Sequence, residues 1–191
     1  MADIVIRVIK YCYIHYCCCI PTIRISQFNT SKRYKSQIGS VSSKGNDTHY
    51  VAQTELDSHA DTIVAGRNCI ALSFSDRSCD VAPYSSQYEP IRNVPIATAA
   101  TGYTSADGRD YILIFHEALW MPSLDHSLIN PNQLRAYDVM VQDNPYSEQP
   151  MQITNPDGEF TACLVSKGTT IYMDTWTPSD QDLSTLPHIV S

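Results

Sequence analysis

Basic residues are scarce in this sequence. Lys and Arg together number 13 of 191 residues, against 20 Asp and Glu, and the formal net charge is −7. Apart from a short stretch at residues 33–37, the basic residues are scattered along the chain. Proteins that bind nucleic acid directly neutralise its phosphates with a concentrated positive surface. The composition therefore argues against nucleic acid as a direct partner.

The sequence also lacks cysteine pairs with zinc-site spacing. Four of the seven cysteines lie within residues 11–20, and Cys69, Cys79 and Cys163 are scattered. Because no C-x-x-C spacing occurs, we expect no structural zinc site, and we expect no other metal or cofactor. An odd number of cysteines with three adjacent ones makes a poor disulfide framework. This indicates a reducing, intracellular location, with the cytoplasm as the expected compartment.

No apolar run is long enough to cross a membrane. The run at residues 11–20 is about half of the ~20 residues that a span requires. It follows Arg7 and Lys10, as the core of a signal peptide would, but no small-residue cleavage site comes after it. Secretion, membrane insertion and acylation of the cluster Cys17–Cys19 stay open as alternatives. The expectation is a protein without a membrane partner.

The character of the sequence changes near residue 50. Residues 26–49 are rich in Ser, Thr, Asn and Lys and show no sustained periodicity, which is typical of a linker. We therefore expect a poorly ordered or irregular leader and linker over 1–49, one domain over 50–177, and a loose tail over 178–191. With 43% apolar residues, a domain of this size can form a hydrophobic core.

The pattern within the domain predicts mainly strands. Apolar or alternating segments at 50–56, 62–65, 93–103, 111–115, 117–121 and 138–142 are separated by turn sequences such as Ser105–Gly108. One short helix is expected over Asn132–Tyr137, directly after Pro131. Many short strands with a single helix predict an all-β barrel or sandwich.

Chemically active side chains are crowded at residues 55–66, ELDSHADTIVAG. Asp57, His59 and Asp61 alternate there at the start of an apolar run. On an extended strand they would project to one face and could bind a metal ion, with His116 and Glu117, or His126, completing the set. Two other interpretations compete with this one. Asp57 could be half of an aspartic-protease pair, in which two close carboxylates share a proton and activate a water molecule, or the cluster could be a polar turn between core strands.

A second motif lies downstream of this cluster. Residues 115–134, FHEALWMPSLDHSLINPNQL, contain ALWMP at Ala118–Pro122 and HSLINPNQL at His126–Leu134. Taken with LDSHA at Leu56–Ala60, their order and spacing resemble the protease region of copia-type retrotransposon polyproteins. In that family an Asp-Ser-Gly-Ala site is followed by a VLYVP-like strand and an NLLSVSQL-like segment. The resemblance covers about residues 50–175.

The resemblance implies a retropepsin-like fold, a small closed β-barrel with one short helix that dimerises and has its active site on the two-fold axis. Asp57 would be the catalytic residue, with one aspartate from each copy. Ser58 would brace the pair across the dimer, and Ala60 would be the small residue that closes the turn. Asp61 would be a turn residue rather than a second catalyst.

The resemblance also places supporting segments around this turn. Ser127, Leu128 and Ile129 would pack behind the site, and a flap would lie within roughly Val81–Thr104, where no glycine-rich tip is visible. His59 stands where the family has glycine. Glycine lets the backbone approach a substrate and a second subunit closely, whereas an imidazole adds bulk and titrates in the physiological pH range.

Three functions follow from these observations. The first is an aspartic endopeptidase domain of a retroelement polyprotein, which would act on peptide or polyprotein substrates as a homodimer without a cofactor. The second is a catalytically inactive, retroelement-derived β domain that self-associates or binds peptides. The third is a metal-binding domain that uses Asp57, His59 and Asp61.

Overall fold

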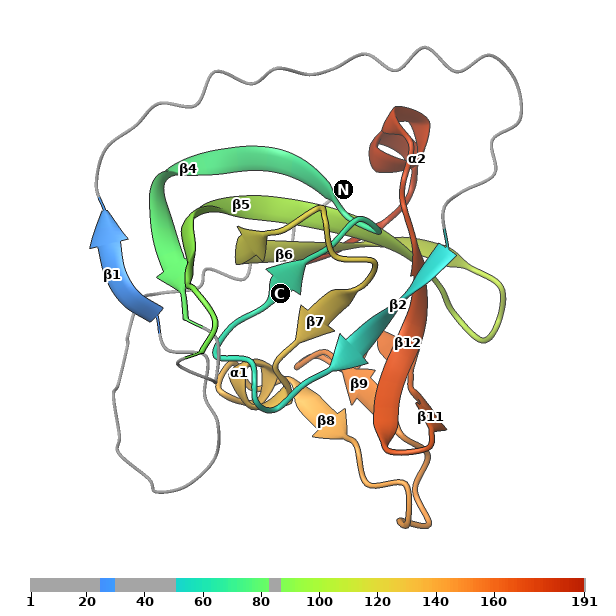
Figure 1. Ribbon diagram of the computed structural model, residues 1–191. Helices are drawn as coiled ribbons and strands as arrows, with labels where there is room; N and C mark the ends of the chain where they lie inside the picture. The colour runs from blue at the N-terminus through green and yellow to red at the C-terminus, as the bar shows by residue number, and fades with distance from the viewer. Residues whose placement is uncertain (1–24, 30–50, 83–86, 191) are drawn as a thin grey trace.

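The fold is seen in a computed structural model, which describes residues 25–29, 51–82 and 87–190, with the backbone alone for 25–29 (Figure 1). Strands make up most of this part of the chain, which confirms the predicted all-β class. The strands are β1 (Ile25–Asn29), β2 (Val51–Leu56), β3 (Val64–Ala65), β4 (Ile70–Val81), β5 (Ile91–Thr104), β6 (Asp110–Trp120), β7 (Ser127–Ile129), β8 (Met140–Gln142), β9 (Gln152–Thr154), β10 (Thr161–Cys163), β11 (Val165–Lys167), β12 (Thr170–Trp176) and β13 (His188–Val190). Two short helices, α1 (Pro131–Arg135) and α2 (Asp180–Thr185), complete it.

Three long strands pair in succession within the larger sheet. β4 pairs with β5, and β5 pairs with β6, both in antiparallel fashion. The strand order of this sheet is β1-β4-β5-β12-β2-β7-β3-β6-β13, with β11 paired to β12. A separate antiparallel sheet has the order β10-β9-β8. Figure 1 shows β8 and β9 of this smaller sheet beside α1.

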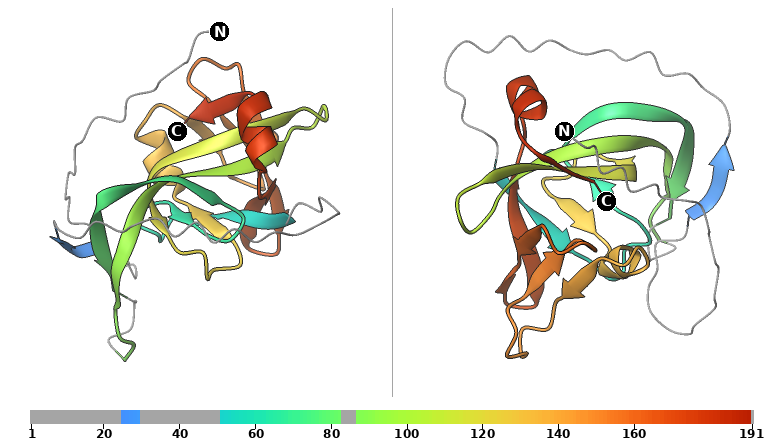
Figure 2. Two further views of the ribbon diagram at one scale, coloured as in Figure 1. Left: turned by 90° about the horizontal axis from the view of Figure 1, so that it is seen from above. Right: turned by 180° about the vertical axis from the view of Figure 1, so that it is seen from behind.

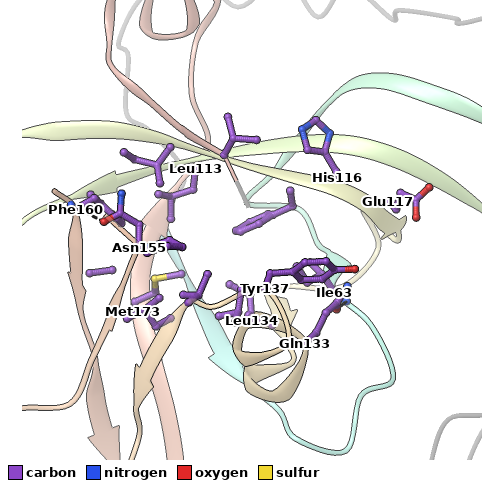
Figure 3. A pocket seen from close by; sticks show the side chains of 18 residues that line it. Ile63, Leu113, His116, Glu117, Gln133, Leu134, Tyr137, Asn155, Phe160 and Met173 are labelled. Carbon is purple, nitrogen blue, oxygen red and sulfur yellow. Dashed lines mark hydrogen bonds between the residues drawn. The ribbon is translucent and has the colours of Figure 1, made fainter. Parts of the chain in front are cut away.

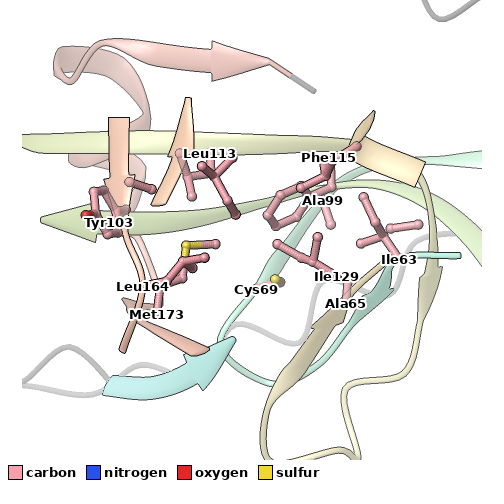
Figure 4. Packing of buried hydrophobic residues seen from close by; sticks show 14 of the residues in the cluster. Ile63, Ala65, Cys69, Ala99, Tyr103, Leu113, Phe115, Ile129, Leu164 and Met173 are labelled. Carbon is pink, nitrogen blue, oxygen red and sulfur yellow. The ribbon is translucent and has the colours of Figure 1, made fainter. Parts of the chain in front are cut away.

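Strand β6 is covered on both faces. Neighbouring side chains along a strand point to opposite sides, and those of β6 enter two different core clusters. Leu113 and Phe115 enter the main core cluster, which Figure 4 shows between β6 and the strands that face it. Ile112 and Ile114 enter a different cluster, on the other face. A strand with both faces covered is expected to be apolar along its length, and the sequence YILIF at 111–115 has this property.

The turn between β5 and β6 is the one that the sequence predicts. The backbone N–H of Gly108 donates to the carbonyl of Ser105 at 2.9 Å. Gly108 has a φ of 80°, which only a residue without a Cβ adopts freely. The hairpin therefore closes as its Ser-Ala-Asp-Gly sequence indicates.

The expected loose tail over 178–191 is wrong for residues 180–190. Ser179 caps α2 in a reciprocal capping box with Asp182, and β13 pairs with β6 in parallel. Leu183 and Leu186 pack against the outer cluster of β5 and β6, and Figure 2 shows α2 against these strands. Apolar residues spaced among polar ones therefore give this segment a half-buried face, and the described part of the chain has a second helix beyond the single one expected.

The leader is described only in part. β1 pairs antiparallel with β4 inside the stretch that the sequence predicts to be irregular. Residues 1–24 and 30–50, which carry the rest of that prediction and the cysteine cluster, lie outside the described residues. Within the described ranges, neither helix is long and apolar enough to span a membrane.

A network of buried polar side chains joins four strands of the larger sheet. The amide nitrogen of Asn68 donates to the hydroxyls of Thr54 at 2.9 Å and Thr175 at 2.7 Å, and its amide oxygen accepts from Ser127 at 2.7 Å. The hydroxyl of Thr101 donates to the Asn68 carbonyl at 2.8 Å. All five residues are fully buried. The buried polar side-chain atoms of Asn68 and its partners all make hydrogen bonds. The network therefore links four strands without leaving a buried polar atom unpaired.

We expect Asn68→Ala to lower the free energy of unfolding by about 2–4 kcal/mol, because it leaves buried hydroxyls without their amide partner. Urea unfolding followed by circular dichroism measures this change. Asn132→Ala, at an exposed position of α1, is the control and should cost about 0.5 kcal/mol or less. Equal effects of the two substitutions would contradict a structural role for the network.

Candidate functional site

The aspartate of the ELDSHADT motif lies at the end of a buried parallel strand pair. β2 pairs with β7 in parallel, with Thr54 opposite Ser127 and Leu56 opposite Ile129. The pairing continues by one bond past the strand, since the backbone N–H of Asp57 donates to the carbonyl of Ile129 at 2.9 Å. The backbone of Asp57 is thereby fixed by β7, while its side chain is carried into the turn that follows.

Residues 57–62 form a turn that folds back on the Asp57 carboxylate. The backbone N–H of His59 donates to Oδ1 of Asp57 at 2.8 Å, which is the local bond by which aspartate stabilises tight turns. The Oγ of Ser58 and the Nδ1 of His59 lie 3.3 Å apart. The side chains of Asp57 and His59 are 35% and 52% exposed. The carboxylate is therefore held at the surface, open to water and to other molecules.

The other side of this turn is anchored by the helix behind it. The side-chain amide of Asn130 donates to the carbonyl of Ala60, and Ala60 is a buried residue. The same side chain caps α1, since its Oδ1 accepts from the backbone N–H groups of Asn132 at 2.7 Å and Gln133 at 3.0 Å. The Oε1 of Gln133 accepts from the backbone N–H of Ile63 at 3.2 Å. The N-terminal part of α1 thus holds the second half of the turn at two points, Ala60 and Ile63.

The strand that leaves the turn is pinned by a close backbone approach. β3 pairs with both β6 and β7, and the backbone N–H of Gly66 donates to Oγ of Ser127 at 2.9 Å. A Cβ on Gly66 would lie 2.3 Å from the carbonyl oxygen of His126. Glycine is therefore required here by the proximity of the His126 backbone.

The three residues predicted to pack behind the site, Ser127, Leu128 and Ile129, all lie on β7, next to β2 and β3. Ser127 joins the Asn68 network, and Ile129 lies in the main core cluster. Leu128 points to the opposite face of the strand. The structure thus places all three against the strands that enter and leave the turn.

The histidine in the glycine position is accommodated without backbone strain. Among the described residues other than glycine, a positive φ occurs only at Asn93, Glu117 and Asp138. His59 therefore has an ordinary φ, and its side chain is exposed. The turn does not depend on glycine at this position.

The metal interpretation of Asp57, His59 and Asp61 required an extended strand, and the structure has a turn there instead. Alternation in the sequence therefore no longer implies that the three side chains share one face. Within 51–82 and 87–190, no group of three or more His, Cys, Asp or Glu side chains is placed to hold a metal ion. Partial burial raises the pKa of the Asp61 carboxyl above its ordinary value, and this side chain takes no part in the bonds around Asp57. The geometric basis for that interpretation is therefore absent.

An apolar cavity of about 340 Å³ opens directly beside the turn. We call it the turn-side cavity. It lies between the turn, β3, the ends of β4 and β5, and the chain around β7. Its lining includes Ala60, Asp61, Thr62, Val64, Val81, Tyr88, Ile91, Leu119, Met121, Leu124 and Leu128.

The end of the β4–β5 hairpin borders this cavity. Val81 pairs with Ile91 at the last described step of the hairpin, and Tyr88 is 69% exposed next to it. This region overlaps the start of the stretch, Val81–Thr104, where a flap was expected. The turning residues 83–86 lie outside the described residues.

Several contributors to the site carry no strong signal in the sequence. Asn130 could have been found as a helix cap, because Asn directly before Pro is a common helix start. Leu124 and Tyr88 line the turn-side cavity and Gln133 bonds to Ile63, and each reaches the site only through the fold. The Nε2 of His126 lies 3.7 Å from Oε2 of Glu55.

No protein-family model, curated protein or solved structure matches this chain. The resemblance to copia-type proteases therefore stays a prediction.

We expect Asn130→Ala to lower the free energy of unfolding by about 2–4 kcal/mol, because it removes the cap of α1 and leaves the buried Ala60 carbonyl unpaired. Asn130→Asp keeps the cap but lacks the donor, and should cost less while still speeding amide exchange at residues 57–63. Ser179→Ala, which removes only the cap of α2, should cost about 1 kcal/mol. Urea unfolding and hydrogen exchange measure these effects. A cost for Asn130→Ala no larger than that for Ser179→Ala would argue against the anchoring of the turn.

Proposed function

We propose that this chain is an aspartic endopeptidase domain of a retroelement polyprotein, which acts as a homodimer with Asp57 from each copy as the catalytic pair. The observation that carries the proposal is a partly exposed Asp57 carboxylate, whose backbone is fixed by β7, in a turn whose later residues 60–62 line an apolar cavity. A turn that carries a carboxylate and also borders a cavity for a side chain of a peptide suits such chemistry.

A retropepsin-like barrel is the fold that we propose for this domain. The pairings run from β5 through β12, β2, β7 and β3 to β6, and β6 also pairs with β5. This circuit of hydrogen bonds supports a closed sheet. The catalytic turn would then lie where β2 leaves the barrel, as the family resemblance implies.

A second copy is needed because this turn supplies one aspartate suited to catalysis. Asp61 lies further along the turn, against the lining of the turn-side cavity. The exposed side chains of Ser58 and His59 leave the turn open to a partner copy. In the dimer, the Ser58 hydroxyl would exchange its contact with His59 for one with the partner's turn and so brace the pair.

The reaction follows from two carboxyl groups that share one proton. The ionised carboxylate removes a proton from a water molecule as the water oxygen attacks the peptide carbonyl carbon. The other carboxyl gives its proton to the carbonyl oxygen, which yields a tetrahedral diol. The nitrogen then takes the proton from the first carboxyl while a diol hydroxyl gives its proton to the second carboxylate, and the carbon–nitrogen bond breaks. A carboxylic acid and an amine are released, and the pair again shares one proton.

The turn-side cavity suggests the substrate class. Its walls are apolar, so an apolar side chain near the cleaved bond would bury surface there and position the peptide. The end of the β4–β5 hairpin, with Tyr88 and Ile91, would cover the bound peptide from the opposite side. Peptides with large apolar residues beside the cleaved bond are therefore the expected substrates.

We expect Asp57→Asn to lower kcat/KM for such peptides at mildly acidic pH by at least about 10²-fold, because the amide cannot act as an acid or base. The Asn Oδ1 still accepts from the N–H of His59, so the turn should keep its structure. Asp61→Asn is the matched control, four positions along the same turn, and should retain activity within about 10-fold. Cleavage is measured with a library of apolar peptides by mass spectrometry.

A mixing experiment tests the dimer. Added in excess to a fixed amount of the parent chain, Asp57→Asn should lower the parent's activity by forming mixed dimers with one aspartate. Excess Asp61→Asn should not lower it. Cleavage that survives in Asp57→Asn itself would refute the mechanism, and peptide binding without cleavage by the parent would favour the inactive β domain.

A further inference from the structure

A second cavity lies on the opposite face of β7 from the turn-side cavity. Leu128 lines the turn-side cavity and Ile129 lines the second one, and neighbouring residues of a strand point to opposite faces. In the same way, Val64 lines the turn-side cavity and its neighbour Ile63 lines the second one. We call this second space the inner cavity. It is separate from Asp57 and has no part in the proposed peptidase mechanism.

The walls of the inner cavity are apolar and come from two layers. Leu113 and Phe115 of β6 form one side, and Ile153, Phe160 and Met173 are among the side chains that form the other. In Figure 3 Leu113 lies on one side of this space, and Leu134 and Met173 lie on the other. Its volume is about 100 Å³. An apolar void of roughly this size stays dry, because water finds no hydrogen-bond partners in it.

The polar groups at the rim are already engaged within the protein. His116 lies 3.2 Å from the Thr98 hydroxyl, and Glu117 pairs with Arg77. The Oε1 of Gln133 accepts from the Ile63 backbone. A charged ligand would therefore have to break existing contacts, and an anion would also meet the Glu117 carboxylate.

We propose that the inner cavity is a binding site for one small, uncharged apolar molecule of about the size of benzene. Such a molecule displaces no ordered water and restores dispersion contacts that the cavity walls lack. A dry apolar cavity of about 150 Å³, lined by Leu, Ile and Phe, is known to bind benzene. The inner cavity has the same kind of lining and a similar order of volume.

Benzene is the probe that tests this site, with benzoate as its charged counterpart. At a benzene concentration ten times the dissociation constant, we expect Tm to rise by about 3–6 °C. Nuclear Overhauser contacts should appear between benzene and the methyl groups of Leu113, Ile129 and Ile153. Benzoate should give neither effect. No contacts with benzene, or equal effects of the two probes, would overturn the proposal.

Two variants locate the binding within the cavity. Ala162→Leu on β10 fills the space from one wall and should weaken benzene binding at least 10-fold. Val139→Phe, at a half-buried position in the lining, does the same from the edge and covers the case in which Ala162→Leu does not fold. Val165→Leu, on exposed β11, is the matched control and should bind as the parent does. Unchanged binding in Val139→Phe would show that benzene binds elsewhere and would overturn the proposal.

Discussion

The buried amide of Asn68 is the interaction on which the rest of the structure depends. It bonds to hydroxyls on β2, β7 and β12, and Thr101 of β5 bonds to its backbone carbonyl. A buried polar group is costly unless every hydrogen bond is made, so this network is stable in one arrangement of the strands and not in others. Apolar contacts alone tolerate small shifts between strands, whereas these bonds do not. The network therefore selects one register from those that the hydrophobic pattern permits.

This register determines where the candidate catalytic aspartate lies. Thr54 and Ser127, which face each other in the β2–β7 pair, are both members of the network. Three residues beyond Thr54, the same register brings the N–H of Asp57 to the carbonyl of Ile129. A slip of one residue would turn the side chains of β2 to the other face. The position of the turn is thus a consequence of polar bonds made within the core, some distance along the strand.

The sequence predicted the all-β class, the β5–β6 hairpin and the helix after Pro131, because each has a strong local signal. It did not predict β4, whose middle residues are exposed and which forms by pairing with β5 and β1. Asn68 gave no signal either, since an asparagine near a glycine ordinarily indicates a turn. The ordered segment with α2 and β13 was missed because its few apolar residues gain a partner only when β6 is already in place. Local chemistry is readable in the sequence, but bonds between distant residues are not.

The turn itself shows how a departure from a family motif can be read physically. A glycine in the third position serves two purposes in principle, backbone freedom and close approach of another chain. The structure separates them, because His59 has an ordinary φ and the turn closes through the Asp57 carboxylate. Only close approach is then affected by the imidazole, which lies exposed, with its Nδ1 3.7 Å from Oδ1 of Asp57. In the proposed dimer, the histidine would therefore act on the Asp57 carboxylate, on the partner copy or on a substrate, and not through the folding of the turn.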